Sequence, residues 1–463
     1  MPNTGGKGDA KAQATGVKPG QNAPRTGRLA RTAIAGAAAA RMGVAQLGHK
    51  AKGLLRDAAA EKQAQAEHDA QLGRIVFAAL NQLKGTALKA SQLLSMELGL
   101  LPPALRQELA RAHYQVTPLN RALVIKVLRQ ELGASPEALF GHFEPQAFAA
   151  ASLGQVHAAR LAGGQPVAVK LQYPGMAHTV ASDMQLLRGL LLPLAASSSK
   201  LPNSGIVTQV LDDIERKLAD ELDYTHEAQA LQWFAEHLCL DGVVIPLPVP
   251  ALCTRRVLTM QRLQGFHLQE WLQTQPSQAL RDHYGQLLFD CFMRSTFALH
   301  HLHADPHPGN YLFMEDGRLG LLDFGCTRVL DASFCTAVQT VWSALLRSPV
   351  DMASVQRAYV AMGLIRADVS AHTFANQLMP ALASLQDWQC LPFTQAVYDF
   401  AQHPAYPEQS AEDQRIALQF LQTVAPDMPY FDRAYLGLVQ MLKAIGARVR
   451  TSNLWIGGDQ LHE

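Results

Sequence analysis

The sequence predicts an α+β protein in which a small sheet separates a helical N-terminal part from a mainly helical second half. Three observations favour this class. The chain has 463 residues and 48% hydrophobic content, enough for a large core. Residues 154–172 form two apolar runs around a Gly163-Gly164 turn, the pattern of a β-hairpin. From residue 268 to about 302, and again after Ala332, apolar side chains recur at helical spacing, whereas residues 303–326 are expected on loops and short strands.

Charge and cysteine content narrow the class of protein. Forty Lys and Arg against 39 Asp and Glu give a net charge of +1, which gives no reason to expect nucleic acid as a partner. Six cysteines lie in the second half without a Cys-x-x-Cys pair, as expected for reduced thiols in the cytoplasm. We find no secretory signal and no run of ~20 apolar residues that could cross a membrane. These features predict a cytoplasmic enzyme.

The N-terminal region contains a polar tail and a basic helix. Residues 1–27 have almost no large apolar side chains and are predicted to be disordered. Residues 28–60 are rich in Ala with interspersed Arg and Lys, which favours helix. One interpretation is an amphipathic segment on an anionic membrane surface. The favoured alternative is a helix that packs on its own domain through four apolar side chains: Ile34, Met42, Val44 and Leu47.

The remaining elements follow in order. Helical patterns cover 74–132, and strand-like sequence begins near Phe148. A single helical stretch covers the acidic segment 214–230, and further strands are expected at 243–249 and 256–260. Long helices are expected from 268 to about 302, and everything after Ala332 has helical character.

Residues 303–310 read HADPHPGN, and LLDFG follows, which places Asp323 thirteen residues after Asn310. Mg²⁺ prefers oxygen ligands from one or two carboxylates and from phosphates. Protein kinases combine an Asp, an Asn five residues later and a separate Asp-Phe-Gly to hold magnesium and a triphosphate. We therefore predict Asn310 and Asp323 as Mg²⁺ ligands and Asp305 as the residue that orients the nucleophile.

Upstream segments complete a nucleotide site. Val-Ala-Val-Lys at 167–170 matches the kinase strand whose Lys, here Lys170, contacts the inner phosphates of ATP and pairs with a helix Glu. The candidates for this Glu are Glu215, Glu221 and Glu227. The phosphate loop is predicted at Ala149, Ala150, Ala151, Ser152, Gly154 and Val156. Two glycines of the kinase loop are alanines here, which restricts φ and the close approach of backbone amides to phosphate. Residues 257–263 are predicted to form the adenine-binding hinge, with Met260 and Leu263 at the nucleotide.

These segments resemble the UbiB family of atypical kinase-like proteins, also called the AarF or ADCK family. The resemblance rests on FAAASLGQVH, VAVKLQYPG, ELDY, HADPHPGN and LLDFG, and on LKGTALKASQLLSME, which is similar to the Lys-x-Gly-Gln element of the family. It implies a protein-kinase-like bilobal fold. The expected parts are a disordered tail (1–27), a helical N-terminal extension (28–135), an N-lobe (136–265) and a helical C-lobe (266–463).

The resemblance also assigns residue roles. Lys89 and Gln92 of the extension would gate the nucleotide pocket, with Glu221 and Asp223 as their acidic partners. Glu227 best matches the helix Glu that pairs with Lys170, and Glu215 is the weaker candidate. Ser91 stands where the family has Gly, but Lys89 and Gln92 are three residues apart and still project from one side of a helix.

The function implied by this resemblance is a Mg²⁺-dependent ATPase or small-molecule kinase that supports ubiquinone or other isoprenoid-lipid metabolism. Implied partners are ATP, a quinone-type lipid or lipid-biosynthetic proteins, and the inner membrane surface as a peripheral contact. An ATP-binding pseudokinase scaffold is an alternative. A zinc metallohydrolase is a remote one, because the histidines at 300, 301, 303 and 307 approach a His-x-His-x-Asp-His pattern but miss it by one residue.

Overall fold

The computed structural model describes residues 28–53, 58–83, 86, 89–90, 94, 119–151, 153–197, 204–423 and 425–456. The chain forms two compact units. The first unit contains residues 1–119 and 175–218, and the second contains 120–174 and 219–463. The tail predicted to be disordered lies outside the described residues.

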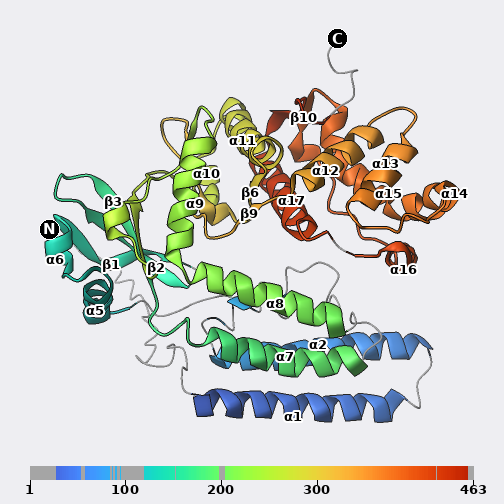
Figure 1. The fold of residues 1–463 in the computed structure, drawn as a ribbon, viewed down its shortest axis with the longest axis horizontal. Helices are drawn as coiled ribbons and strands as arrows, with labels where there is room; N and C mark the ends of the chain where they lie inside the picture. The colour runs from blue at the N-terminus through green and yellow to red at the C-terminus, as the bar shows by residue number, and fades with distance from the viewer. Residues whose placement is uncertain are drawn as a thin grey trace, which may run out of the picture. The chain divides into compact units, whose positions relative to one another are not determined.

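In the described part of the first unit, long helices predominate (Figure 1). They are α1 (Arg28–Gly53), α2 (Ala58–Leu83), α7 (Val180–Ser197) and α8 (Ser204–Glu221), whose last turn belongs to the second unit. Helix α1 contacts α2 and α7. Ile34 and Met42 are buried, so the packing interpretation is correct for these residues. It is wrong for Val44, which is 72% exposed because it lies off the face on which Ile34, Ala38 and Met42 recur every four residues. Leu47 has no described side chain.

Polar contacts fix the helices of the first unit to each other. Arg188 of α7 pairs with Asp212 and Glu215 of α8, at 2.6 and 2.7 Å. The hydroxyl of Thr86 donates to the fully buried carboxylate of Asp183 and lies 2.7 Å from that of Thr179. Glu215, the weaker candidate partner of Lys170, is thus engaged by Arg188.

The second unit begins with helices and an antiparallel sheet (Figure 1). Helices α5 (Arg121–Leu132) and α6 (Pro136–Leu139) precede strands β1 (His142–Ala151), β2 (Gly154–Arg160) and β3 (Pro166–Gln172), and β5 (Val257–Gln261) completes the order β1-β2-β3-β5. The predicted hairpin is confirmed as β2 and β3. The strand expected near Phe148 begins six residues earlier, at His142. Pro145 hides it in the sequence, and the structure accommodates this proline on the edge strand, within the register shift between Phe143 and Ala147.

Helices form most of the remainder of this unit. They are α9 (Tyr224–His237), α10 (Leu268–Gln273), α11 (Gln278–Met293), a π-helical turn (Arg294–Ala298), α12 (Ala332–Leu345), α13 (Met352–Ala361), α14 (Ala371–Thr373), α15 (Met379–Cys390), α16 (Ala411–Phe420) and α17 (Met428–Ile445). Short strands are β4 (Val243–Val244), β6 (His301–His303), β7 (Tyr311–Phe313), β8 (Leu319–Leu321), β9 (Thr327–Val329), β10 (Val397–Asp399) and β11 (Arg448–Arg450).

Two helical predictions for this region need correction. The helix expected up to residue 302 ends at Ala298, and His301–His303 pair with β9 instead. The region after Ala332 is not entirely helical, because β10 and β11 form a two-stranded sheet. In both cases a strand of three residues is too short to show a period in the sequence.

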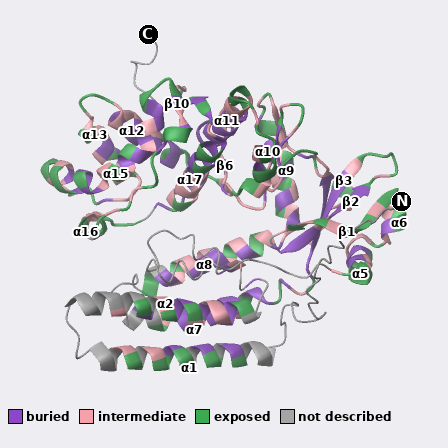
Figure 2. Ribbon diagram, turned by 180° about the vertical axis from the view of Figure 1, so that it is seen from behind, coloured by how far each residue is buried: buried purple, intermediate pink, exposed green. Residues whose placement is uncertain are grey.

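The core of the helical lobe is aromatic. Phe431 and Tyr435 of α17 contact Trp342 of α12, with ring centroids 5.5 and 4.9 Å apart. Buried residues run through α11 and α17 and along the central strands of the sheet (Figure 2). Helix α17 is therefore a central element of the lobe that carries the motifs at 303–325.

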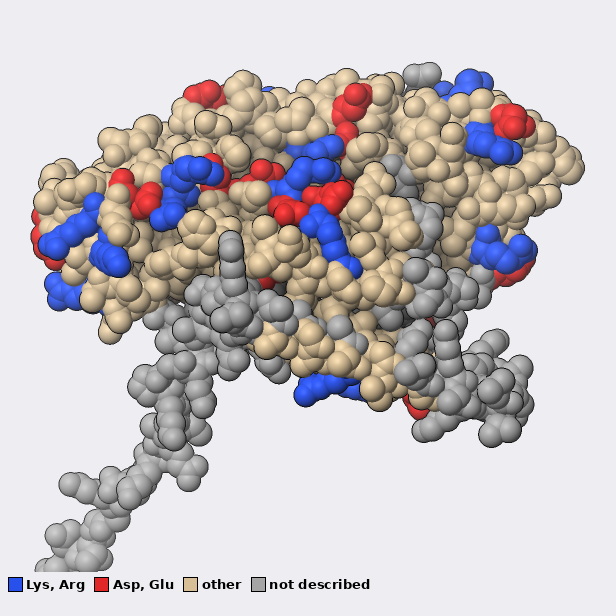
Figure 3. Space-filling view, turned by 60° about the horizontal axis from the view of Figure 1, so that its bottom comes forward, with Lys and Arg blue, Asp and Glu red and all other residues tan. Residues whose placement is uncertain are grey.

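The surface of the described residues carries charges of both signs. On the face shown in Figure 3, Lys and Arg alternate with Asp and Glu, in agreement with the net charge of +1. Within the described part of the chain, no helix combines the length and apolar character that crossing a bilayer would require.

Candidate active site

An ion cluster links three segments that are distant in the sequence. Nζ of Lys170, on β3, donates to both carboxylate oxygens of Glu227 on α9 at 2.8 Å and to Oδ2 of Asp323 at 3.1 Å. The side chains of Lys170 and Glu227 are 7% and 4% exposed, whereas Asp323 is 35% exposed. The carboxylate of Asp323 is therefore the accessible member of the cluster, at the edge of the buried Lys170–Glu227 pair.

Burial and charge determine the protonation of this cluster. Burial alone would lower the pKa of Lys170, but the carboxylates of Asp323 and Glu227 raise it well above its ordinary value. Burial and the charge of Asp323 raise the pKa of Glu227 to about 7, despite its contact with Lys170. Lys170 therefore remains a cation at neutral pH, and two carboxylates compete for it.

The strand register shows which side chains lie on the same face of the sheet as Lys170. Val156 lies opposite Lys170 on β2, and Met260 on β5 lies opposite Ala168. Side chains directly opposite each other, or two apart on one strand, share a face of a sheet. Val156, Ala168, Lys170 and Met260 therefore lie on the same face. Ala168 was not singled out from the sequence, although its place two residues before Lys170 could have indicated it.

The acidic segment is two helices, not one. Helix α8 ends at Glu221 and α9 begins at Tyr224. The side chain of Asp223 accepts from the amide of Thr225, so it caps α9. Its other oxygen accepts from Arg255 at 3.0 Å. Helix α9 begins at this cap and carries Glu227, whose carboxylate reaches Lys170.

The predicted phosphate loop closes as a tight hairpin between β1 and β2. Ala149, Ala150 and Ala151 pair with Val156, Gln155 and Gly154, and Ser152 lies outside the described residues. Gly154 has no room for a side chain, because a Cβ would lie 2.3 Å from the carbonyl oxygen of Leu171 and 2.8 Å from the hydroxyl of Tyr224. Packing therefore requires a glycine at position 154.

Tyr224 was missed by the sequence reasoning, although it lies within the quoted ELDY motif. Its ring centroid is 5.0 Å from Nζ of Lys170, a cation–π contact. The residue is 3% exposed, and its hydroxyl has no hydrogen-bond partner among the described residues. Tyr224 therefore packs between the phosphate loop and the lysine.

The loop 303–310 holds its aspartate and asparagine together. Nδ2 of Asn310 donates to Oδ2 of Asp305 at 2.9 Å and to the Asp305 carbonyl at 3.2 Å. This contact uses the amide nitrogen, so Oδ1 of Asn310 is available as a ligand. His307 accepts from the amide of Gly309 and so caps the short turn Pro308–Asn310.

A β-hairpin brings Asn310 and Asp323 to one place. Strand β7 begins directly after Asn310, and β8 ends two residues before Asp323, with Tyr311 opposite Leu321. The amide of Leu322 donates to the carbonyl of Asn310 at 2.9 Å. Two oxygen-bearing side chains therefore lie at the same end of the hairpin, and this hard donor set fits magnesium.

The backbone around Asp323 is held from both sides. Oδ1 of Asp323 accepts from the amide of Gly325 at 2.9 Å. Its carbonyl accepts from Nε2 of His303 at 2.6 Å, and the ring of His303 packs edge-on against Phe324. His303 therefore fixes the Asp-Phe-Gly segment.

The histidines do not form a metal site. His301 packs against Trp233 and Phe234, at 4.1 and 4.8 Å between centroids, while His303 and His307 make the contacts given above. Within the described residues, no group of three or more His, Cys, Asp or Glu side chains converges as metal ligands would. The structure gives no support to the zinc metallohydrolase alternative.

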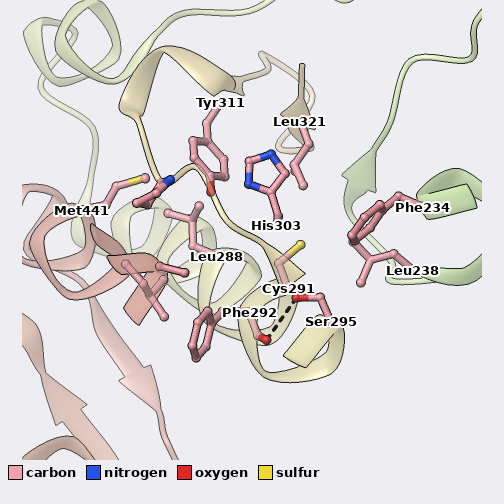
Figure 4. Close-up of a pocket in the computed structure, with 13 residues that line it drawn as sticks. Phe234, Leu238, Leu288, Cys291, Phe292, Ser295, His303, Tyr311, Leu321 and Met441 are labelled. Atoms are coloured by element: carbon pink, nitrogen blue, oxygen red, sulfur yellow. Dashed lines mark hydrogen bonds between the residues drawn. The ribbon is translucent and has the colours of Figure 1, made fainter. Parts of the chain in front are cut away.

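A small cavity lies behind the loop 303–310 (Figure 4). Its volume is about 30 Å³, and most of its lining is apolar, from α9, α11 and α17. His303 and Tyr311 line it with ring centroids 6.1 Å apart, and Nδ1 of His303 is buried without a partner among the described residues. A space of this size holds one or two water molecules and is too small for a nucleotide.

The remaining predicted residues lie as follows. Leu263 follows β5, and its Cδ1 is 3.0 Å from the position that a Cβ on Gly320 would occupy. Lys89 belongs to the first unit, and Gln92 lies outside the described residues. Gating by Lys89 and Gln92, with Glu221 and Asp223 as partners, stays a prediction.

The fold and the site define a kinase-like protein. A small antiparallel sheet carries Lys170, helix α9 carries its partner Glu227, and the helical lobe carries the Asp305–Asn310 loop and the Asp-Phe-Gly segment. The ABC1 atypical kinase-like domain matches residues 111–358, which is more than half of the chain. The chain belongs to this family, which confirms the resemblance to UbiB and ADCK proteins.

Individual relatives agree with this membership. The chain is 33% identical to rat atypical kinase COQ8B, mitochondrial, over 66% of this chain and 58% of the rat protein. It is 32% identical to atypical kinase COQ8, mitochondrial, of Saccharomyces cerevisiae, over 55% of this chain and 50% of the yeast protein. The chain thus spans about half the length of the curated relatives it matches.

A solved structure has the same fold. It is that of the Mycobacterium tuberculosis protein Rv3197 in complex with erythromycin, with a TM-score of 0.59 and 23% identity. The match covers 84% of this chain and 96% of the other. At this identity, the similarity concerns the fold alone.

Proposed function

We propose that this protein binds Mg²⁺·ATP and transfers the γ-phosphoryl group to water or to a small hydroxyl compound. One observation carries the proposal: Lys170 lies between Glu227 and Asp323 in a single ion cluster. Phosphoryl transfer needs positioned charges more than covalent chemistry, and this cluster provides a fixed cation and a metal-binding carboxylate.

Each residue has a role that follows from its position. Lys170, oriented by Glu227, would bind the inner phosphates. Asp323 and Oδ1 of Asn310 would hold Mg²⁺, which neutralises charge on the phosphates when bound. Asp305, held by the amide of Asn310, would orient the attacking hydroxyl or water and accept its proton. Val156, Ala168 and Met260 would enclose the adenine from the sheet.

Two features argue against phosphorylation of ordinary protein substrates. Only Cys326–Asp331 separate the Asp-Phe-Gly segment from α12, and half of them form β9, which pairs with β6. A long activation loop, which protein kinases order by phosphorylation, has no room in this stretch. The second feature is the alanine content of the phosphate loop. A small-molecule acceptor or water fits these features better.

The family resemblance and the relatives named COQ8 support a role in ubiquinone or isoprenoid-lipid metabolism, and we propose peripheral contact with a membrane on the same basis. Release of phosphate from ATP, measured with and without anionic liposomes, tests the activity. Asp323→Asn should abolish most of the turnover, and Lys170→Ala should weaken stabilisation by Mg²⁺·ATP. Stabilisation by nucleotide without turnover in the wild type would favour the pseudokinase scaffold. Unchanged values in both variants would refute the proposed site.

A further inference from the structure

Helix α17 contacts the loop that carries Asp305 through an arginine. Nε of Arg433 donates to the carbonyl oxygen of Ala304 at 2.9 Å, and a terminal guanidinium nitrogen donates to the same oxygen. That terminal nitrogen also lies 3.1 Å from Sγ of Cys326. A guanidinium is planar and always charged, so its donors hold these acceptors in a fixed geometry.

The two groups that Arg433 contacts belong to the two loops of the site. Ala304 directly precedes Asp305, and Cys326 directly follows the Asp-Phe-Gly segment. The loops also bond to each other here, since the amide of Ala304 donates to the carbonyl of Cys326 at 2.9 Å. Ala304 is fully buried. Arg433 therefore lies at the junction of the two loops.

A second contact comes from the same face of α17. Gly437 is four residues after Arg433, and residues four apart are neighbours on a helix surface. A Cβ on Gly437 would lie 2.2 Å from Cγ and 2.3 Å from Cβ of Pro306. The helix thus contacts the residue before Asp305 through Arg433 and the residue after it through Gly437.

We propose that Arg433 is a positioning residue for phosphoryl transfer. Arg433 fixes the backbone directly before Asp305. It also fixes the distance between that backbone and the Asp-Phe-Gly segment that contains Asp323. This inference rests on the proposed function. It assigns to α17, an element outside the nucleotide-binding motifs, the control of catalytic geometry. A displacement of about 1 Å at a catalytic group can cost on the order of 10²-fold in rate.

The test compares Arg433→Gln, Arg433→Lys and Gly437→Ala with wild type, using phosphate release at varied ATP. We expect kcat to fall by roughly 10- to 100-fold in Arg433→Gln with KM changed by less than about threefold, because the contacts of Lys170 are unaltered. Arg433→Lys should recover part of the rate, since an ammonium group can still donate to Ala304. Arg415→Gln is the control, because Arg415 is 65% exposed and pairs only locally with Glu412.

Gly437→Ala distinguishes positioning of the Asp305 loop by α17 from a role of this contact in the stability of the fold alone. Alanine favours helix over glycine, so the exchange should not weaken α17 itself, yet it forces Pro306 away and should lower kcat. Wild-type kcat in the Arg433 variants, or lower thermal stability with unchanged kcat, would overturn the inference. If Arg433→Gln does not fold, Arg433→Lys and Gly437→Ala decide the matter.

A further readout does not depend on the proposed activity. Hydrogen exchange without nucleotide should show faster exchange of the Ala304 amide in Arg433→Gln, with the amides of β3 unchanged. If wild-type protein neither binds nor hydrolyses ATP, the proposed function fails, and this exchange measurement still reports whether Arg433 fixes the loop. Unchanged protection of the Ala304 amide would refute the positioning role itself.

Discussion

Replacing Lys170 by methionine should destabilise the protein in a pH-dependent way. The exchange keeps an unbranched side chain but leaves the carboxylate of Glu227 buried beside Asp323 without a cation. At 2.8 Å and an effective dielectric constant of about 20, the lost attraction is about 6 kcal/mol. Removal of the ammonium group also removes its desolvation cost, which offsets part of the lost attraction. Measured losses on breaking a buried ion pair are typically about 3–5 kcal/mol. We expect the loss to approach this range at pH 9 and above.

The pH dependence follows from the pKa of Glu227. Burial has already raised it to about 7, and removal of Lys170 raises it further. A carboxyl group whose folded pKa lies above its unfolded value contributes stability at low pH, which is lost as pH rises through the folded pKa. The destabilisation of Lys170→Met should therefore be small near pH 5 and grow above pH 7, by at most about 1.4 kcal/mol per pH unit.

Thermal unfolding between pH 5 and pH 9 measures this effect. At about 2 °C per kcal/mol for a unit of this size, the midpoint should fall by about 3 °C at pH 8 and by about 6 °C at pH 9. Lys126→Met, on the exposed face of α5, is the control. The double variant Lys170→Met, Glu227→Gln should recover much of the loss, because no unpaired charge stays buried. A loss that is independent of pH, or a double variant as unstable as the sum of the singles, would refute the reasoning.

Two further substitutions test the packing around the site. Gly154→Ala should lower the thermal midpoint and weaken stabilisation by Mg²⁺·ATP, because the added Cβ would lie 2.3 Å from a backbone carbonyl oxygen. Overpacking of this kind costs about 1–3 kcal/mol. A thermal midpoint equal to that of wild type would contradict this contact. Asp427→Ala should lower the free energy of unfolding by about 1–3 kcal/mol, because this carboxylate is 8% exposed and accepts hydrogen bonds from Arg328 and from the amide of Asp331. Urea denaturation measures the change. A loss of stability no larger than that of Arg415→Gln would contradict the prediction.

Much of the site could be predicted because its chemistry is encoded in short segments. Asp305 and Asn310 are five residues apart and contact each other directly. The hairpin that carries Lys170 is defined by a glycine turn between two short apolar runs, so it can be recognised from local rules. Spacing and residue type within about ten positions are thus sufficient to indicate these groups.

Other features depend on contacts between distant segments. The sequence left three glutamates open for Lys170, and the contact with Glu227 depends on the packing of α9 against the sheet. Strand β1 was predicted too short, because edge pairing tolerates a proline that the local pattern treats as a break.

The sequence by itself determined the family, the α+β class and the residue types of the proposed nucleotide site, since each depends on local order and spacing. Only the tertiary structure decided how the backbone around Asp305 is fixed. Arg433 is 129 residues from Ala304, and no local pattern encodes a contact over that separation. It arises because packing of α17 in the core places one face of the helix against the loop, with an arginine and a glycine at the points of contact.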